Sequence, residues 1–213
     1  MKKMTGLLAG LAMLLAMALA VNVSFAREST KKKAEVGKPA PQFTLTDVVT
    51  GKEISLADYK DKIVVMTFQS INCPWDRDRP EAGYQRVLSP LSKEWKDKGV
   101  AFIAVNSNYN ESSDAVGSYA KENQIPYPIL KDSGNVVADE YGGRTTPHFY
   151  VIDNDKDQTL LYMGGYEKAP NTPEQCGKMD EQYLVPVVTA VLEGKETPYT
   201  VTKSKGCGIK RQK

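Results

Sequence analysis

The sequence predicts an α/β fold in which a mixed central β-sheet is flanked by helices. Apolar runs of strand length alternate along the chain with segments of helical character. Two short strands near the start and two near the end are each joined by a brief turn, which predicts antiparallel pairs at both places. Strands that alternate with helices are typical of a sheet covered by helices.

The first 26 residues are predicted to be a secretory signal peptide. Met1-Lys2-Lys3 is a basic start, residues 7–21 are an apolar core, and Ser24-Phe25-Ala26 fits a cleavage site after Ala26. An uncleaved membrane anchor is the alternative, but the apolar run is shorter than the ~20 residues that a spanning helix needs. We therefore expect an exported protein, periplasmic or secreted, without stable membrane contact after cleavage.

The remainder divides into a charged leader (27–35), one domain (36–194) and a C-terminal tail (195–213). Lys2 and Lys3 account for the whole excess of 28 basic over 26 acidic residues, so the chain after residue 26 has no formal net charge. That balance gives no reason to expect a nucleic-acid partner.

The first half of the domain is organised around one buried strand. Residues 42–45 and 53–56 are expected to form an antiparallel pair that turns at Gly51-Lys52, and Ser55 to Tyr59 a short turn. The β-branched run Ile63–Phe68 reads as the central strand. Pro74 then predicts a helix from 74 to 88, bent at Pro80, and a second helix from 90 to 98.

The second half continues the alternation of strands and helices. The expected strands cover 100–105, 127–130, the run from 149, and 159–163, and the expected helices cover 113–123, 135–141 and 182–192. Ser113-Asp114 can cap the first of these helices, and Gly194 ends the last.

Cys73 is the leading candidate for a reactive thiol. It stands where the central strand is expected to lead into a helix, in Gln69-Ser70-Ile71-Asn72-Cys73-Pro74-Trp75. A sulfur at a helix N-terminus is stabilised as a thiolate, the reactive form. A buried structural cysteine is the alternative.

A second motif, Thr146-Pro147, leads into the strand at 149. Together the two motifs resemble the thioredoxin fold, over about residues 36 to 166. The resemblance implies that Thr146 and Pro147 pack beside Cys73 and offer backbone to an extended substrate. Whether the bond between them is cis stays open at this point.

Four further stretches are similar to the peroxiredoxin-like redoxins of the alkyl hydroperoxide reductase and thiol-specific antioxidant superfamily. They are Asn72-Cys73-Pro74, Val100–Asn108, Thr146-Pro147 and Gly206–Lys210. The resemblance implies that the Ser70 hydroxyl positions a peroxide. The sequence departs from the family at Met66, where a proline is usual, and at Pro147, where an arginine is usual.

The chain does not contain a Cys-x-x-Cys motif, because Asp76 takes the second position. We therefore expect Cys207, between two glycines on a mobile tail, to resolve the intermediate formed at Cys73. A static bridge to Cys176 is the alternative, and the odd count of three cysteines leaves the pairing open. No pair is spaced like a zinc site, so neither a metal nor another cofactor is expected.

Two neighbours of these motifs are weaker candidates. Trp75 is assigned to substrate contact, with plain packing as the alternative. The chain's single histidine, His148, could act as a base, although a side chain there more often faces the sheet or solvent.

The sequence thus predicts an exported thiol oxidoreductase with a peroxide or disulfide substrate and a protein thiol as electron donor. A thioredoxin-fold module that binds peptides without turnover is the alternative, and a copper-carrying redoxin is a distant third. The sequence does not distinguish the substrates, identify the donor or set the oligomeric state.

Overall fold

The structure is a computed structural model that describes residues 33–59, 61–77, 82–153 and 157–212. The predicted signal peptide and most of the predicted leader lie outside these ranges, as do the predicted kink at Pro80 and the tip of the second hairpin. Residues 31–213 belong to one compact unit, which therefore includes the predicted tail. No helix among the described residues is long and apolar enough to cross a membrane.

A seven-stranded mixed sheet forms the centre of the fold, in the order β2-β1-β5-β4-β3-β7-β8. Its strands are β1 (Thr44–Asp47), β2 (Glu53–Ser55), β3 (Ile63–Phe68), β4 (Val100–Asn106), β5 (Ile129–Lys131), β7 (His148–Asp153) and β8 (Thr159–Gly164). β3 runs parallel to β4, and β4 parallel to β5, whereas the remaining neighbours are antiparallel. All six residues of β3 are buried, which explains its unbroken apolar sequence.

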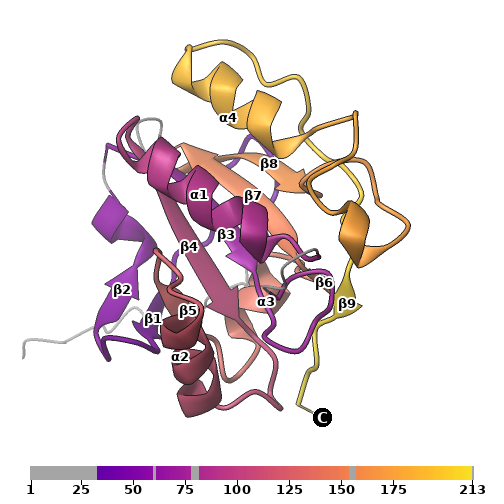
Figure 1. Ribbon diagram of the computed structural model, residues 1–213. Coiled ribbons are helices and arrows are strands. Elements are labelled where there is room, and N and C mark those ends of the chain that lie inside the picture. Colours follow the sequence, from indigo (N-terminus) through magenta and orange to yellow (C-terminus); the bar gives the residue numbers. More distant parts are fainter. Residues whose placement is uncertain (1–32, 60, 78–81, 154–156, 213) are drawn as a thin grey trace, which may run out of the picture. The chain divides into compact units, whose positions relative to one another are not determined.

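Helices cover both faces of this sheet (Figure 1). They are α1 (Gln85–Lys96), α2 (Ser113–Glu122), α3 (Val136–Glu140) and α4 (Leu184–Leu192), with 3₁₀ turns at η1 (Leu56–Tyr59) and η3 (Pro173–Gln175). Since side chains alternate across a strand, Val65 packs with residues of α1, α2 and α4, whereas Val64 and Met66 pack with residues of α3. The two apolar layers therefore hold β3 from both sides.

The predicted α/β class, the central strand and the two strand pairs are confirmed. The expected N-terminal hairpin is β1 and β2, and β1 also pairs with β5, so the hairpin forms one edge of the sheet. The cap of α2 is one residue earlier than predicted, because the Ser112 side chain accepts a hydrogen bond from the Ala115 backbone N–H at 3.2 Å.

The predicted helix start at 74 and the predicted break between helices 74–88 and 90–98 are wrong, because a single helix, α1, covers Gln85–Lys96. Residues after Cys73 form a turn in which the N–H groups of Asp76 and Arg77 both donate to the Cys73 carbonyl, at 3.0 and 2.9 Å. Gly83 has a φ of +83°, a left-handed conformation that ends any helix there, and a Cβ on it would overlap the Arg77 carbonyl oxygen. One helix, α1, follows from Gln85.

Pro90 lies inside α1 and does not start a new helix. Its ring is exposed, so it does not displace side chains of the core. The proline therefore interrupts one hydrogen bond without ending the helix.

The C-terminal tail forms a second, two-stranded sheet beside the main one. β9 (Cys207–Gly208) pairs antiparallel with β6 (Thr145–Thr146), opposing Thr146 to Cys207. The tail lies close to β6 in Figure 1. It is therefore part of the folded domain, contrary to the mobile tail that the sequence predicted.

Candidate active site

Cys73 lies in the loop that follows β3, next to β6. Its side chain is 1% exposed, and its Sγ donates a hydrogen bond to the Thr146 carbonyl at 3.0 Å. The Thr146-Pro147 peptide bond is cis. The expected contact between the reactive cysteine and the threonine–proline loop is therefore present.

Cys207 reaches the same place from the C-terminus. Pairing of β9 with β6 sets Cys207 opposite Thr146, so Cys207 and Cys73 line the same cavity, and all three cysteines are free thiols. Cys207 is half-buried, whereas Cys176 is buried elsewhere, against the Trp75 carbonyl and Tyr84. The structure brings Cys73 and Cys207 together and leaves Cys176 apart.

The surroundings of Cys73 favour its protonated form. Burial raises the pKa of the Cys73 thiol to about 12, and the charge of Asp76 and the hydrogen bond with Cys207 act in the same direction. The helix N-terminus that was expected to lower this pKa is absent, because α1 begins at Gln85.

Asp76 is a completely buried carboxyl group behind this thiol. One oxygen accepts a hydrogen bond from the Ser70 N–H at 2.6 Å, and Oδ1 has no hydrogen-bond partner among the residues that the structure describes. Burial raises the pKa of Asp76 well above its usual range, and the nearby charge of Glu111 adds to this effect. A carboxyl group with a raised pKa is less often charged, which moderates its repulsion of a thiolate.

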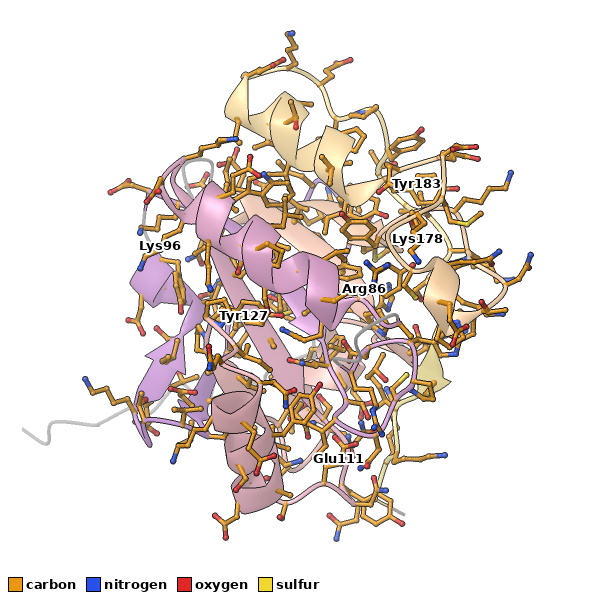
Figure 2. The ribbon with its side chains drawn as sticks, in the orientation of Figure 1. Arg86, Lys96, Glu111, Tyr127, Lys178 and Tyr183 are labelled. Atoms are coloured by element: carbon orange, nitrogen blue, oxygen red, sulfur yellow. The ribbon has the colours of Figure 1, made fainter. Side chains whose placement is uncertain are left out.

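Glu111 joins the Cys73 loop to the loop after β4 (Figure 2). Its carboxylate is 3% exposed and accepts a hydrogen bond from the Ser70 hydroxyl at 2.7 Å. Further donors are the N–H groups of Ile71 and Asn72 and the side-chain amides of Asn72, Asn106 and Asn108. Lys131 Nζ donates to the Glu111 backbone carbonyl at 2.6 Å. This network fixes the loop that carries Cys73.

A cavity of about 170 Å³ opens beside the two thiols. Its lining includes Ser70, Asn72, Cys73, Asn108, Glu111 and Cys207. Most of these residues have polar groups, but the surface that they expose to the cavity is mainly apolar, so the space beside the thiols suits a small molecule.

The other predicted residues have different surroundings. Trp75 is partly buried against the core, and Lys205 Nζ lies 5.1 Å from the centroid of its ring. His148 has Tyr150 as its hydrogen-bond partner at 3.1 Å, and burial lowers the pKa of its imidazole to about 4, with Arg144 adding to the effect. The described residues contain no group of three or more side chains that could hold a metal ion.

Sequence reasoning missed Glu111. An acidic residue in a polar loop carries no signal of its own. The pairing of strands could have indicated it. β3 and β4 are consecutive buried strands that pair in parallel, and the loops that follow parallel neighbours meet at one edge of the sheet, so the loop with Glu111 lies beside the loop with Cys73.

Two curated proteins are similar to this chain in sequence. A thiol-disulfide oxidoreductase ResA from Bacillus cereus is 34% identical over 128 residues, which cover 60% of this chain and 69% of that protein. A chloroplastic peroxiredoxin Q from Gentiana triflora is 29% identical over 70% of this chain and 68% of its own length.

Two solved structures are similar to this one in fold. An uncharacterized conserved protein from Geobacillus kaustophilus is 32% identical, with a TM-score of 0.72 over 84% of this chain and 93% of its own. The thioredoxin domain of a thiol-disulfide oxidoreductase from Bacteroides vulgatus has a TM-score of 0.50 at 23% identity, over 62% of this chain and 89% of its own, and supports the fold alone.

These findings define the chain as a thiol oxidoreductase with a thioredoxin-like fold. The family model described as AhpC/TSA matches residues 36–158. The chain belongs to the AhpC/TSA family.

Proposed function

We propose that this protein is an exported thiol-disulfide oxidoreductase in which Cys73 and Cys207 alternate between a dithiol and a disulfide. The observation that carries the proposal is that Cys73 and Cys207 line one cavity, where the pairing of β9 with β6 holds Cys207 beside Thr146. The similarity to ResA proteins, whose name states thiol-disulfide oxidoreductase activity, supports it.

The proposed reaction takes two exchange steps. Cys73 Sγ attacks one sulfur of a substrate disulfide, and the other half leaves as a thiolate that takes up a proton. Cys207 Sγ then attacks Cys73 Sγ, which closes the Cys73–Cys207 disulfide and releases the second half as a thiol. Two electrons and two protons pass from the cysteines to the substrate. A protein thiol donor returns the pair to the dithiol.

Peroxide reduction is the second candidate, favoured by the Ser70 hydroxyl in the cavity beside Cys73 and by the similarity to peroxiredoxin Q. In that reaction Cys73 becomes a sulfenic acid, an alcohol or water leaves, and Cys207 closes the disulfide with release of water. The raised pKa of Cys73 does not distinguish the two reactions, because the thiolate is the attacking species in both. Arg144, the arginine nearest in sequence to the family position, is exposed.

Mass spectrometry of the reduced protein tests the choice of substrate. We expect a stoichiometric small disulfide to cause a loss of two hydrogens that maps to Cys73–Cys207, faster than an equal amount of hydrogen peroxide does. Cys207→Ser should trap a mixed disulfide on Cys73, and Cys176→Ser should behave as the wild type. A faster reaction with peroxide would favour the second candidate. Inertness toward both would contradict the proposed activity.

Export is proposed from the predicted signal peptide. A protein collected from the periplasm or medium should begin at Arg27, and its intact mass measures this directly. A cytoplasmic protein that retains Met1 to Ala26 would contradict export. An exported thiol oxidoreductase of this kind would contribute to redox homeostasis outside the cytoplasm.

A further inference from the structure

The backbone edge of β6 is occupied by the protein's own C-terminus. Thr145 pairs with Gly208 and Thr146 with Cys207. An unpaired strand edge is the surface on which an extended peptide can add as a further strand. Here that edge lies directly beside Cys73, whose Sγ donates to the Thr146 carbonyl, and β9 already covers it.

Contacts on both sides of Cys207 hold the tail in place. Before it, the Thr145 hydroxyl donates to the Ser204 hydroxyl at 2.8 Å. After it, Ile209 is buried at 7% exposure in the apolar layer that contains α3 residues, and its N–H donates to the Arg144 carbonyl at 3.0 Å.

The last residues add further contacts. The Lys210 N–H donates to Asn108 Oδ1 at 2.7 Å, and its carbonyl accepts from the Tyr109 N–H at 3.0 Å. Arg211 pairs with Asp139 at 2.9 Å. A peptide that pairs with β6 would therefore have to displace a buried side chain and several hydrogen bonds.

The space that stays open beside the thiols is small. It is the cavity of about 170 Å³ next to Cys73 and Cys207. The volume is equivalent to about six water molecules at the ~30 Å³ that each occupies in the liquid. A short disulfide with hydrogen-bonding groups fits this volume, and a strand of polypeptide does not.

We infer that the docked tail selects the substrate: the Cys73–Cys207 pair reduces small disulfides, whereas β9 excludes extended polypeptides from the edge of β6. This inference rests on the proposed function and specifies its substrate class. The docked tail also keeps Cys207 beside Cys73, so the same strand both completes the thiol pair and restricts access to it.

Two glycines offer a matched pair of variants. A Cβ on Gly206 would overlap the Thr146 carbonyl oxygen, whereas the nearest atom to a Cβ on Gly208 is the Arg144 carbonyl oxygen at 4.0 Å. Gly206→Ala should therefore release β9, and Gly208→Ala should leave it docked. Ile209→Asp is a second way to release the tail, because it places a charge in the buried position.

Tail release is measured before activity. Hydrogen exchange at the Tyr109 and Ile209 amides, together with the rate of alkylation of Cys207, should rise in Gly206→Ala and Ile209→Asp. Both rates should stay at the wild-type values in Gly208→Ala. Circular dichroism and thermal unfolding identify a variant that does not fold.

The substrate test presents the same mixed disulfide on two carriers, a small molecule and an extended peptide. The mixed disulfide of 2-mercaptoethanol with N-acetylcysteine amide is the small substrate, and the same cysteine at the centre of an extended peptide is the large one. We expect the reduced wild type to react with the small substrate at least about tenfold faster in a single turnover, a factor equivalent to ~1.4 kcal/mol. Release of the tail should remove that preference, because Cys73 then becomes accessible to both.

The outcomes of the substrate test distinguish failure of the selection by the tail from failure of the proposed function. Equal wild-type rates on both carriers, with formation of the Cys73–Cys207 disulfide, would overturn the selection by the tail and leave the proposed function intact. A preference that persists after the tail is released would overturn it as well. If neither carrier oxidises the wild-type pair, the proposed function itself fails.

Discussion

At the scale of single residues, Asp76 has the clearest effect on Cys73. Its charge raises the pKa of the thiol, so its removal should lower that pKa and increase the thiolate fraction at neutral pH. We predict that Asp76→Asn, which keeps an oxygen to accept from the Ser70 N–H, increases the alkylation rate of Cys73 at pH values at which the wild-type carboxyl is ionised, by about tenfold for each unit that the thiol pKa falls. The pH profile of iodoacetamide labelling, read by peptide mass, measures it.

The same variant should change stability with a definite sign. The pKa of Asp76 is higher in the folded than in the unfolded protein. The contribution of Asp76 to the free energy of unfolding is therefore greatest below its unfolded pKa and is lost as the pH rises through its folded pKa. Asp76→Asn should therefore unfold at a higher temperature than the wild type at neutral pH, and the two should converge in acid. An unchanged labelling profile together with unchanged stability would contradict this account of Asp76.

His148 gives a second prediction at this scale. Burial lowers the pKa of its imidazole to about 4, so the folded protein holds it neutral at pH 7. The neutral imidazole contributes its full share of the folding stability above the unfolded pKa of ~6.5, and this contribution is lost as the pH falls toward 4. Because the chain has a single histidine, proton NMR follows its titration without assignment. A midpoint near 6.5 would contradict the buried environment.

At the scale of elements, Glu111 ties together the ends of β3 and β4. Glu111→Gln keeps one acceptor oxygen but turns an amide donor toward the donors of the Cys73 loop. We expect it to lower the free energy of unfolding by about 1–3 kcal/mol, the usual cost of a buried group left unsatisfied. Urea unfolding measures the change.

The matched control is Glu122→Gln at the end of α2, where the side chain is exposed. It should change stability by less than about 0.5 kcal/mol. Equal effects of the two variants would show that the Glu111 carboxylate does not support the loop. Oxidation of the Cys73–Cys207 pair should also slow in Glu111→Gln alone, since that variant loosens the Cys73 loop.

At the scale of the whole molecule, the two thiols join distant parts of the chain. A disulfide between residues 73 and 207 closes a loop longer than 100 residues, for which chain entropy predicts a stabilisation of about 5 kcal/mol. We expect the oxidised protein to unfold at a clearly higher denaturant concentration than the reduced protein. A Cys176→Ser background prevents other pairings, and an oxidised form no more stable than the reduced one would mean that the bond strains the fold.

Much of this architecture could be predicted from the sequence, because strands that are buried on both faces of the sheet have mainly apolar sequences, such as Ile63–Phe68. The place of Cys73 and its contact with Thr146 followed from the two proline motifs. The helix expected after Pro74 was wrong, since local rules do not reveal that Asp76 turns inward or that Gly83 takes a left-handed conformation.

The site was less predictable than the fold because it is assembled from distant segments. Glu111 acquires its role only when β3 and β4 lie side by side. Cys207, between glycines in a polar stretch, reads as part of a free tail, and the sole local indication of docking is the apolar Ile209 two residues later. Thr146 and Cys207 pair although they are 61 positions apart, and such long-range pairing leaves no sequence pattern in either segment.

The position of β9 also sets the order in which the protein can be completed. A ribosome synthesises β9 after all the other strands described above, so Cys207 becomes available only after Cys73 and β6 have been made. Until then Cys73 and the edge of β6 have no β9 beside them. A newly made chain therefore passes through a stage in which its reactive cysteine is exposed to other thiols and strands, and the pairing of β9 with β6 ends that stage.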